Sequence, residues 1–141
     1  MNNQQLLSVL LKITQSGQVQ IRGILDVVMG PGLRSILLSQ LREYDAMETE
    51  TLTLGLQRGW DLKHLEPARR FLTDRTIRFL VAVHNSDSGI AEIMIRKNTN
   101  AMICSLKNLH RSQCAEPQLG ILFQKIHDCE TDHIRRLQSY L

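Results

Sequence analysis

The chain has 141 residues, 43% of them hydrophobic, and we expect residues 1–141 to form a single domain. Its net charge of +3, from 17 basic and 14 acidic residues, is too small to predict a nucleic-acid surface. No apolar run approaches the ~18 residues of a membrane span, and no secretory signal is visible. Three cysteines without a pairing pattern argue against a disulfide framework and favour a cytoplasmic protein.

Apolar residues recur every three or four positions along most of the chain, which predicts helices rather than strands. The first helix is expected over residues 3–28, with Asn2 or Asn3 as its cap. The second is expected over residues 33–58, because the Gly-Pro-Gly run at 30–32 ends one helix and leaves only a short link. Helices joined by so short a link are antiparallel neighbours.

The third helix is expected over residues 67–110, beginning at Pro67. At ~1.5 Å per residue it would exceed about 60 Å and project beyond its neighbours. Residues 85–89 favour a turn, but the apolar stripe from 77 to 109 keeps its phase across them. We therefore expect a continuous or kinked, overlong third helix. A fourth helix over residues 116–140 completes an all-α, antiparallel four-helix bundle.

Several polar residues lie on the apolar stripes of these helices. Counting helical turns from the expected ends places Tyr44 and Asn98 near mid-height, and His84 also falls on the stripe of its helix. These three residues are expected to form a buried, hydrogen-bonded polar layer. Gly17 lies on the first stripe, which indicates a close approach of a neighbouring helix or a kink.

A Glu-x-x-His motif lies on the fourth helix, at Glu130 and His133. Residues three apart share a helix face, and ferritin-like di-iron proteins use this spacing on two helices with one Glu from each of the others. Glu48 and Glu92 are the further ligand candidates. The first helix has no glutamate and the second no histidine, so the di-iron set is incomplete. Two interpretations are left: a site for a single metal ion, and a polar layer that is purely structural.

The chain resembles a group of uncharacterised bacterial proteins that are regarded as ferritin-like helical bundles. The similarity lies in residues 88–95 and 106–110, and in the Arg-Arg-Leu-x-x-x-Leu pattern of residues 134–141. It implies a ferritin-like four-helix bundle without an assigned activity. Members of that group lack a consistent metal-ligand set, so His133 is a departure from their pattern.

Two functions follow. The favoured one is a non-enzymatic scaffold that needs no cofactor and forms a homodimer through the third helix, because its half over 71–83 would exceed the bundle. The alternative is a ferritin-like protein that binds iron, manganese or zinc through Glu130 and His133, with Glu48 or Glu92. No catalytic motif is present, and we assign no catalytic residue. Acidic groups converging on His133 would favour the metal-binding alternative.

Overall fold

The computed structural model describes residues 1–111 and 116–141, and this part of the chain contains five α-helices and no strands. The helices are α1 (Asn3–Leu25), α2 (Pro31–Arg58), α3 (Pro67–Val83), α4 (Asp87–Arg111) and α5 (Pro117–Leu137), followed by a short 3-10 turn over Gln138–Tyr140. The predicted all-α class is confirmed. None of the described helices is long and apolar enough to cross a membrane.

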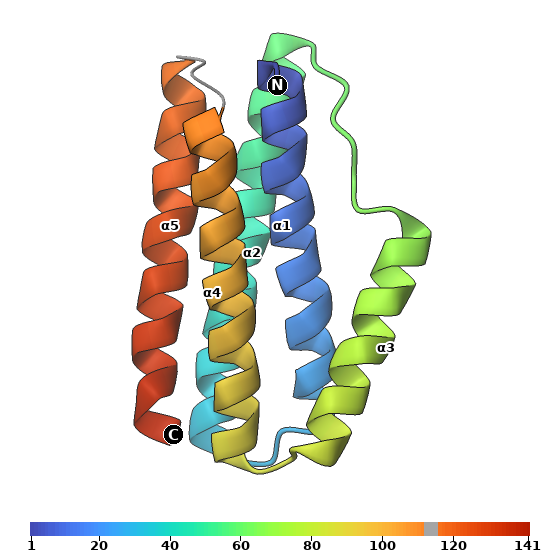
Figure 1. The fold of residues 1–141 in the computed structure, drawn as a ribbon, viewed down its shortest axis with the longest axis vertical. Coiled ribbons are helices and arrows are strands. Elements are labelled where there is room, and N and C mark those ends of the chain that lie inside the picture. Colours follow the sequence, from blue (N-terminus) through green and yellow to red (C-terminus); the bar gives the residue numbers. More distant parts are fainter. Residues whose placement is uncertain (112–115) are drawn as a thin grey trace.

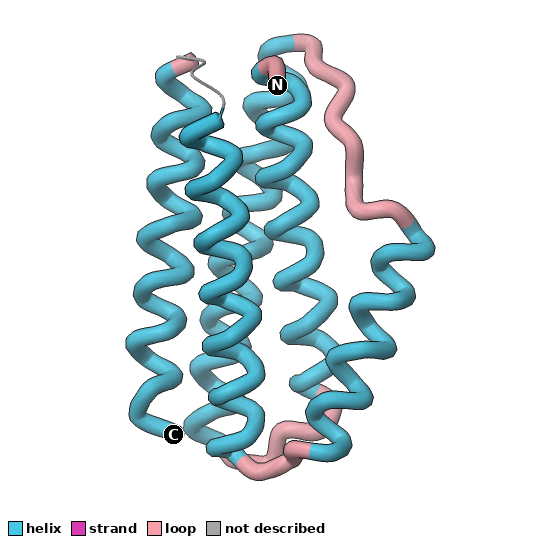
Figure 2. Tube along the Cα trace, viewed as in Figure 1, coloured by secondary structure: helices cyan, strands magenta, loops and turns pink. Residues whose placement is uncertain are grey.

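Four of the helices lie side by side along the long axis of the molecule (Figure 1). α1 and α2 run in opposite directions, and so do α4 and α5, whereas α2 and α4 run in the same direction. The segment that connects α2 to α4 therefore has to run back along the side of the molecule to the end at which α2 began. The extended loop and α3 make this return, and α3 packs beside α1 (Figures 1 and 2).

Local sequence explains where the first two helices begin and end. The Asn2 Oδ1 accepts from the Gln5 N–H at 2.8 Å, and the Gln5 side chain accepts from the Asn2 N–H at 3.0 Å, a complete capping box. α1 ends at Leu25, three residues before the expected end. α2 begins with Pro31, whose fixed φ suits a first turn, and ends at Gly59 with φ of 70°.

The prediction of one continuous third helix was wrong. α3 ends at Val83 and α4 begins at Asp87, and His84 has φ of −120° and ψ of 69°, outside the helical region. The Gly89 N–H donates to the Ser86 Oγ at 3.0 Å, so Ser86 caps a new helix. α3 and α4 each bury an apolar face of their own, and these two faces together produce the stripe that looked continuous in the sequence.

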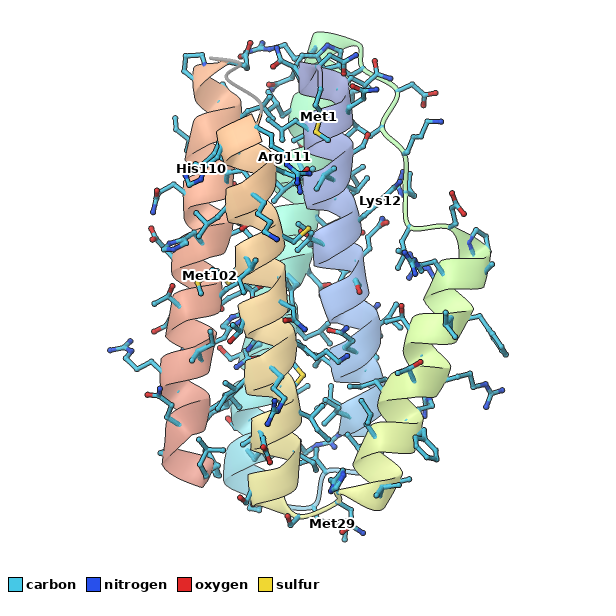
Figure 3. All side chains as sticks on the ribbon, in the orientation of Figure 1. Met1, Lys12, Met29, Met102, His110 and Arg111 are labelled. Carbon is cyan, nitrogen blue, oxygen red and sulfur yellow. The ribbon has the colours of Figure 1, made fainter. Side chains whose placement is uncertain are left out.

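The side chains of the four long helices fill the space between them (Figure 3). Leucine, isoleucine, Tyr44 and Phe123 dominate this core. α3 contributes little to it, since only Ile77 and Val81 of that helix are buried. One face of α3 remains open: Leu72, Phe79 and Val83 are 56%, 69% and 58% exposed.

Candidate metal centre

Tyr44 on α2 donates a hydrogen bond to Glu130 Oε1 on α5, and both side chains are buried. The Tyr44 hydroxyl also lies 3.4 Å from the Oδ1 of buried Asn98 on α4. These three residues form one polar layer that joins three helices. His84, which the sequence analysis placed in this layer, is instead exposed, because it lies in the turn that breaks the expected third helix.

Glu130 forms no ion pair with any cation in the part of the chain that the structure describes. The pKa of its carboxyl is raised to about 8, mainly by burial and to a smaller extent by the charge of Glu43, although the hydrogen bond from Tyr44 acts to lower it. Its second oxygen, Oε2, has no hydrogen-bond partner among the described residues. At neutral pH the Glu130 carboxyl is therefore mainly protonated and contributes little charge to the core.

Beside this layer, three potential metal ligands converge from two helices. Cys129 and His133 are one turn apart on α5, and Glu43 reaches them from α2. Glu43 Oε2 contacts His133 Nε2, and the Cys129 Sγ lies 3.2 Å from that nitrogen and 3.4 Å from that oxygen. We call these residues the Glu43–Cys129–His133 cluster. All three donor atoms lie within 4.8 Å of one another.

Burial sets the protonation of this cluster. His133 is fully buried, edge-on to the Tyr44 ring with centroids 5.4 Å apart, and burial lowers the pKa of its imidazole although Glu43 acts to raise it. Burial likewise raises the pKa of the Cys129 thiol, and the charge of Glu43 adds to this effect. Without a bound metal, these shifts favour a neutral imidazole and a protonated thiol. Within the described chain, His133 Nδ1 has no hydrogen-bond partner.

The cluster is accessible from one side. The Glu43 side chain is 37% exposed, and its Oε1 lies 3.3 Å from the Nη2 of Arg136, which also pairs with Asp132 at 2.5 Å. Arg135 and Arg136 lower the pKa of Asp132, and these pairs neutralise Asp132 beside the cluster. An open groove of about 460 Å³ between α2 and α5 is lined by Glu43, Cys129 and Asp132, so an ion from solvent can reach two of the three ligands, while His133 lies buried behind them.

Two of the ligand candidates from the sequence lie elsewhere. Glu48 accepts hydrogen bonds from Gln15 and Gln18 and so faces α1, not α5. Glu92 is exposed and pairs with Arg96 on its own helix at 2.9 Å. Glu130 and His133 do lie side by side in the core, but Glu130 is bonded to Tyr44 and is not a member of the three-residue cluster.

Sequence reasoning missed Glu43 and Cys129 as candidate ligands. The four-residue spacing of Cys129 and His133 was a usable signal, since it places both side chains on one face of a helix. Comparison with protein-family models, with curated proteins and with solved structures finds no match to this chain. The chemistry of the cluster is therefore argued from its donor atoms and their surroundings.

Proposed function

We propose that the protein binds one transition-metal ion, with zinc the best match, through the Glu43–Cys129–His133 cluster. The observation that carries this proposal is the convergence of sulfur, nitrogen and oxygen donors at separations of 3.2 and 3.4 Å. In a tetrahedral zinc site, bond lengths near 2.3 Å to sulfur and 2.0–2.1 Å to nitrogen and oxygen place neighbouring donor atoms about 3.3–3.6 Å apart. The Glu43 carboxylate and the His133 imidazole, which are in direct contact, would have to move apart to admit the ion.

The donor types favour zinc over the other metals considered. A thiolate with an imidazole suits zinc, whereas manganese prefers sites built mainly from oxygen. Glu43 and a deprotonated Cys129 together balance the charge of a divalent ion. Burial favours the neutral imidazole that a metal requires, and coordination through Nε2 would replace the proton that this nitrogen shares with Glu43. Three protein ligands leave a fourth position for water from the groove between α2 and α5.

The helix order supports a ferritin-like relationship for the metal-binding proposal. Two antiparallel helix pairs joined by one long crossover are the arrangement of ferritin-like bundles. The donor set, however, favours one ion rather than two irons, because Glu130 is bonded to Tyr44 and Glu92 is on the surface. Since His133 Nδ1 lacks a partner, we expect affinity about 10–100-fold below that of a site with a complete outer shell.

The test is the metal content of protein purified without chelator, measured by elemental mass spectrometry. We expect near-stoichiometric zinc in the wild type and its loss in His133→Ala. The matched control is His127→Ala, a histidine on the same helix that lies outside the cluster. Wild-type protein without metal, or equal metal in both variants, would refute the proposal. Cys129→Ser repeats the test with almost no change in volume, and circular dichroism confirms that each variant is folded.

A second candidate function is homodimerisation through the open face of α3. Leu72, Phe79 and Val83 are seven and four residues apart, so they share one side of that helix. Three large apolar side chains, each more than half exposed on one face, are typical of an interaction surface. We propose a second copy of this chain as the partner, because pairing this face with itself would cover both copies at once.

A further inference from the structure

A second candidate site lies on the other side of α1, away from the metal centre. A cavity of about 430 Å³, open to solvent, is bordered by α1, α3, α4 and the loop that precedes α3. Towards its N-terminal end α3 leans away from α1, and this divergence accompanies the cavity (Figure 1). Nothing in the proposed metal chemistry uses this space.

The cavity is lined by basic residues from three different helices. Lys12 comes from α1, Arg69 from α3 and Lys97 from α4, and no acidic residue is in the lining. Throughout residues 1–111 and 116–141, no acid lies within ion-pair distance of any of these three side chains. Like charges around one cavity repel one another, and a bound anion relieves that repulsion.

Uncharged donors complete the lining. Ser16 of α1, Thr73 of α3 and Asn100 of α4 face the same cavity, and their side chains make no hydrogen bond to the part of the chain that the structure describes. Hydroxyl and amide groups of this kind supply further hydrogen bonds to the oxygens of an anion. Ile13 and the ring of Tyr44 provide an apolar portion of the wall.

The cavity extends along α3. A neighbouring cavity of about 160 Å³ shares Gln20, Arg69, Thr73 and Lys97 with it, so the two are contiguous. The combined space is suited to a small molecule, since ligand pockets of about 300–1,000 Å³ hold drug-sized compounds. Arg69 and Lys97 line both cavities, which allows them to bind two separated anionic groups of one ligand.

We propose that this cavity binds a small polyanion whose charged groups are phosphates or carboxylates. Arg69 offers a planar fork for two oxygens of one group, and Lys12 and Lys97 act as point charges on either side. The three hydroxyl and amide side chains complete the hydrogen bonding, and the apolar wall contacts the body of the ligand. The site shares no residue with the Glu43–Cys129–His133 cluster, although the Tyr44 ring in its wall also packs edge-on against His133.

Titration calorimetry with inorganic pyrophosphate, and separately with citrate, tests the proposal. We expect saturable binding of at least one of them at moderate salt, and the tighter one distinguishes phosphate from carboxylate recognition. Lys97→Glu should weaken that binding by about tenfold or more, because it removes a hydrogen bond to a charged group and adds repulsion. Arg69→Gln should weaken it to a similar degree.

Lys107→Glu is the matched control, because it makes the same charge change on an exposed residue of α4 outside the cavity. Its affinity should stay within about twofold of the wild type, as expected for a distant, screened charge. No saturable binding of either anion would overturn the proposal, as would equal losses in Lys97→Glu and Lys107→Glu.

Discussion

Tyr44 and Glu130, which are 86 residues apart in the sequence, are joined by a hydrogen bond in the centre of the helix assembly. The bond connects α2 to α5 and brings a tyrosine hydroxyl onto a carboxyl group that burial keeps mainly protonated. The Glu43–Cys129–His133 cluster lies beside this bond. Glu43 directly precedes Tyr44 on α2, and Cys129 and His133 lie on either side of Glu130 on α5. The relative position of α2 and α5 at this level therefore controls both the polar layer and the candidate metal centre.

Tyr44→Phe should destabilise the protein by about 1–3 kcal/mol, because Glu130 Oε1 would be left buried without its donor. Urea unfolding followed by circular dichroism measures the effect. Tyr140→Phe is the matched control: it removes the same hydroxyl from a half-buried ring whose side chain makes no hydrogen bond to described residues. Equal stability changes in the two variants would contradict a specific role for the Tyr44–Glu130 bond.

Glu130 should make stability fall as pH rises. Its pKa is about 8 in the folded chain against an ordinary value of 4.5, so between these values the folded protein holds a proton that the unfolded chain has released. The free energy of unfolding then decreases by up to about 1.4 kcal/mol per pH unit across this range. Glu130→Gln stays neutral, so its stability relative to the wild type should increase towards alkaline pH.

Unfolding curves from about pH 5 to about pH 9 measure this difference. Glu92→Gln makes the same substitution at an exposed position and should run parallel to the wild type. If the Glu130→Gln curve also runs parallel to the wild type, Glu130 is ionised in the folded protein and our assignment of its protonation fails.

Zinc affinity should increase with pH, because coordination replaces the proton of Cys129, whose pKa is raised by burial. Release of one proton corresponds to about a tenfold gain in affinity per pH unit. Competition titrations with a chromophoric chelator at several pH values measure this slope. Cys129→Ser should bind weakly and lose most of the pH dependence, whereas a pH-independent affinity would exclude the thiol as a ligand.

Phe79→Glu should convert a dimer into a monomer, because it places a charge in the middle of the open face of α3. Light scattering over a wide range of concentrations measures the molecular mass. Ile121→Glu is the control, since Ile121 is 51% exposed on α5, a different helix. A wild-type protein that stays monomeric at every concentration would exclude the self-pairing of α3.

Gly17→Ala should destabilise the protein even though alanine is the better helix former by about 1 kcal/mol. An added Cβ would lie 2.8 Å from ring atoms Cε2 and Cζ of Tyr44, so the ring would have to move from its partners. Gly120→Ala is the control, because no atom of the described residues lies within 4 Å of the corresponding Cβ, and it should be neutral or stabilising. Thermal unfolding of both variants shows whether each substitution raises or lowers the stability of the protein.

The elements that local sequence determines were the ones predicted well. The Asn2 cap and the end of α2 at Gly59 each depend on residues within one helical turn, whereas Pro31 and Gly32 of the expected link belong to the first turn of α2. The break after Val83 also had a local signal in residues 85–89. The uninterrupted apolar stripe outweighed it in our prediction, although a shared phase does not require one continuous helix.

The candidate centre was predictable only in part, for a physical reason. Glu130 and His133 were identifiable because one helix periodicity places both on the core stripe. Which residue of α2 contacts His133 depends on how α2 is shifted and rotated relative to α5. Identifying that residue requires the register of the two helices to be known to within one residue. Glu43 and Glu48 are five residues apart on α2, yet one contacts His133 and the other faces α1.

The crossover between α2 and α4 has a consequence for how the protein folds. α1 with α2, and α4 with α5, are pairs of sequence neighbours, so each pair can form early through local contacts. The contacts of Tyr44 with Glu130 and of Glu43 with His133 span 86 and 90 residues, and they form only when the two pairs dock. The Glu43–Cys129–His133 donor set is therefore complete only after the two helix pairs have docked. The rate at which a refolding chain binds zinc would then report the rate of docking.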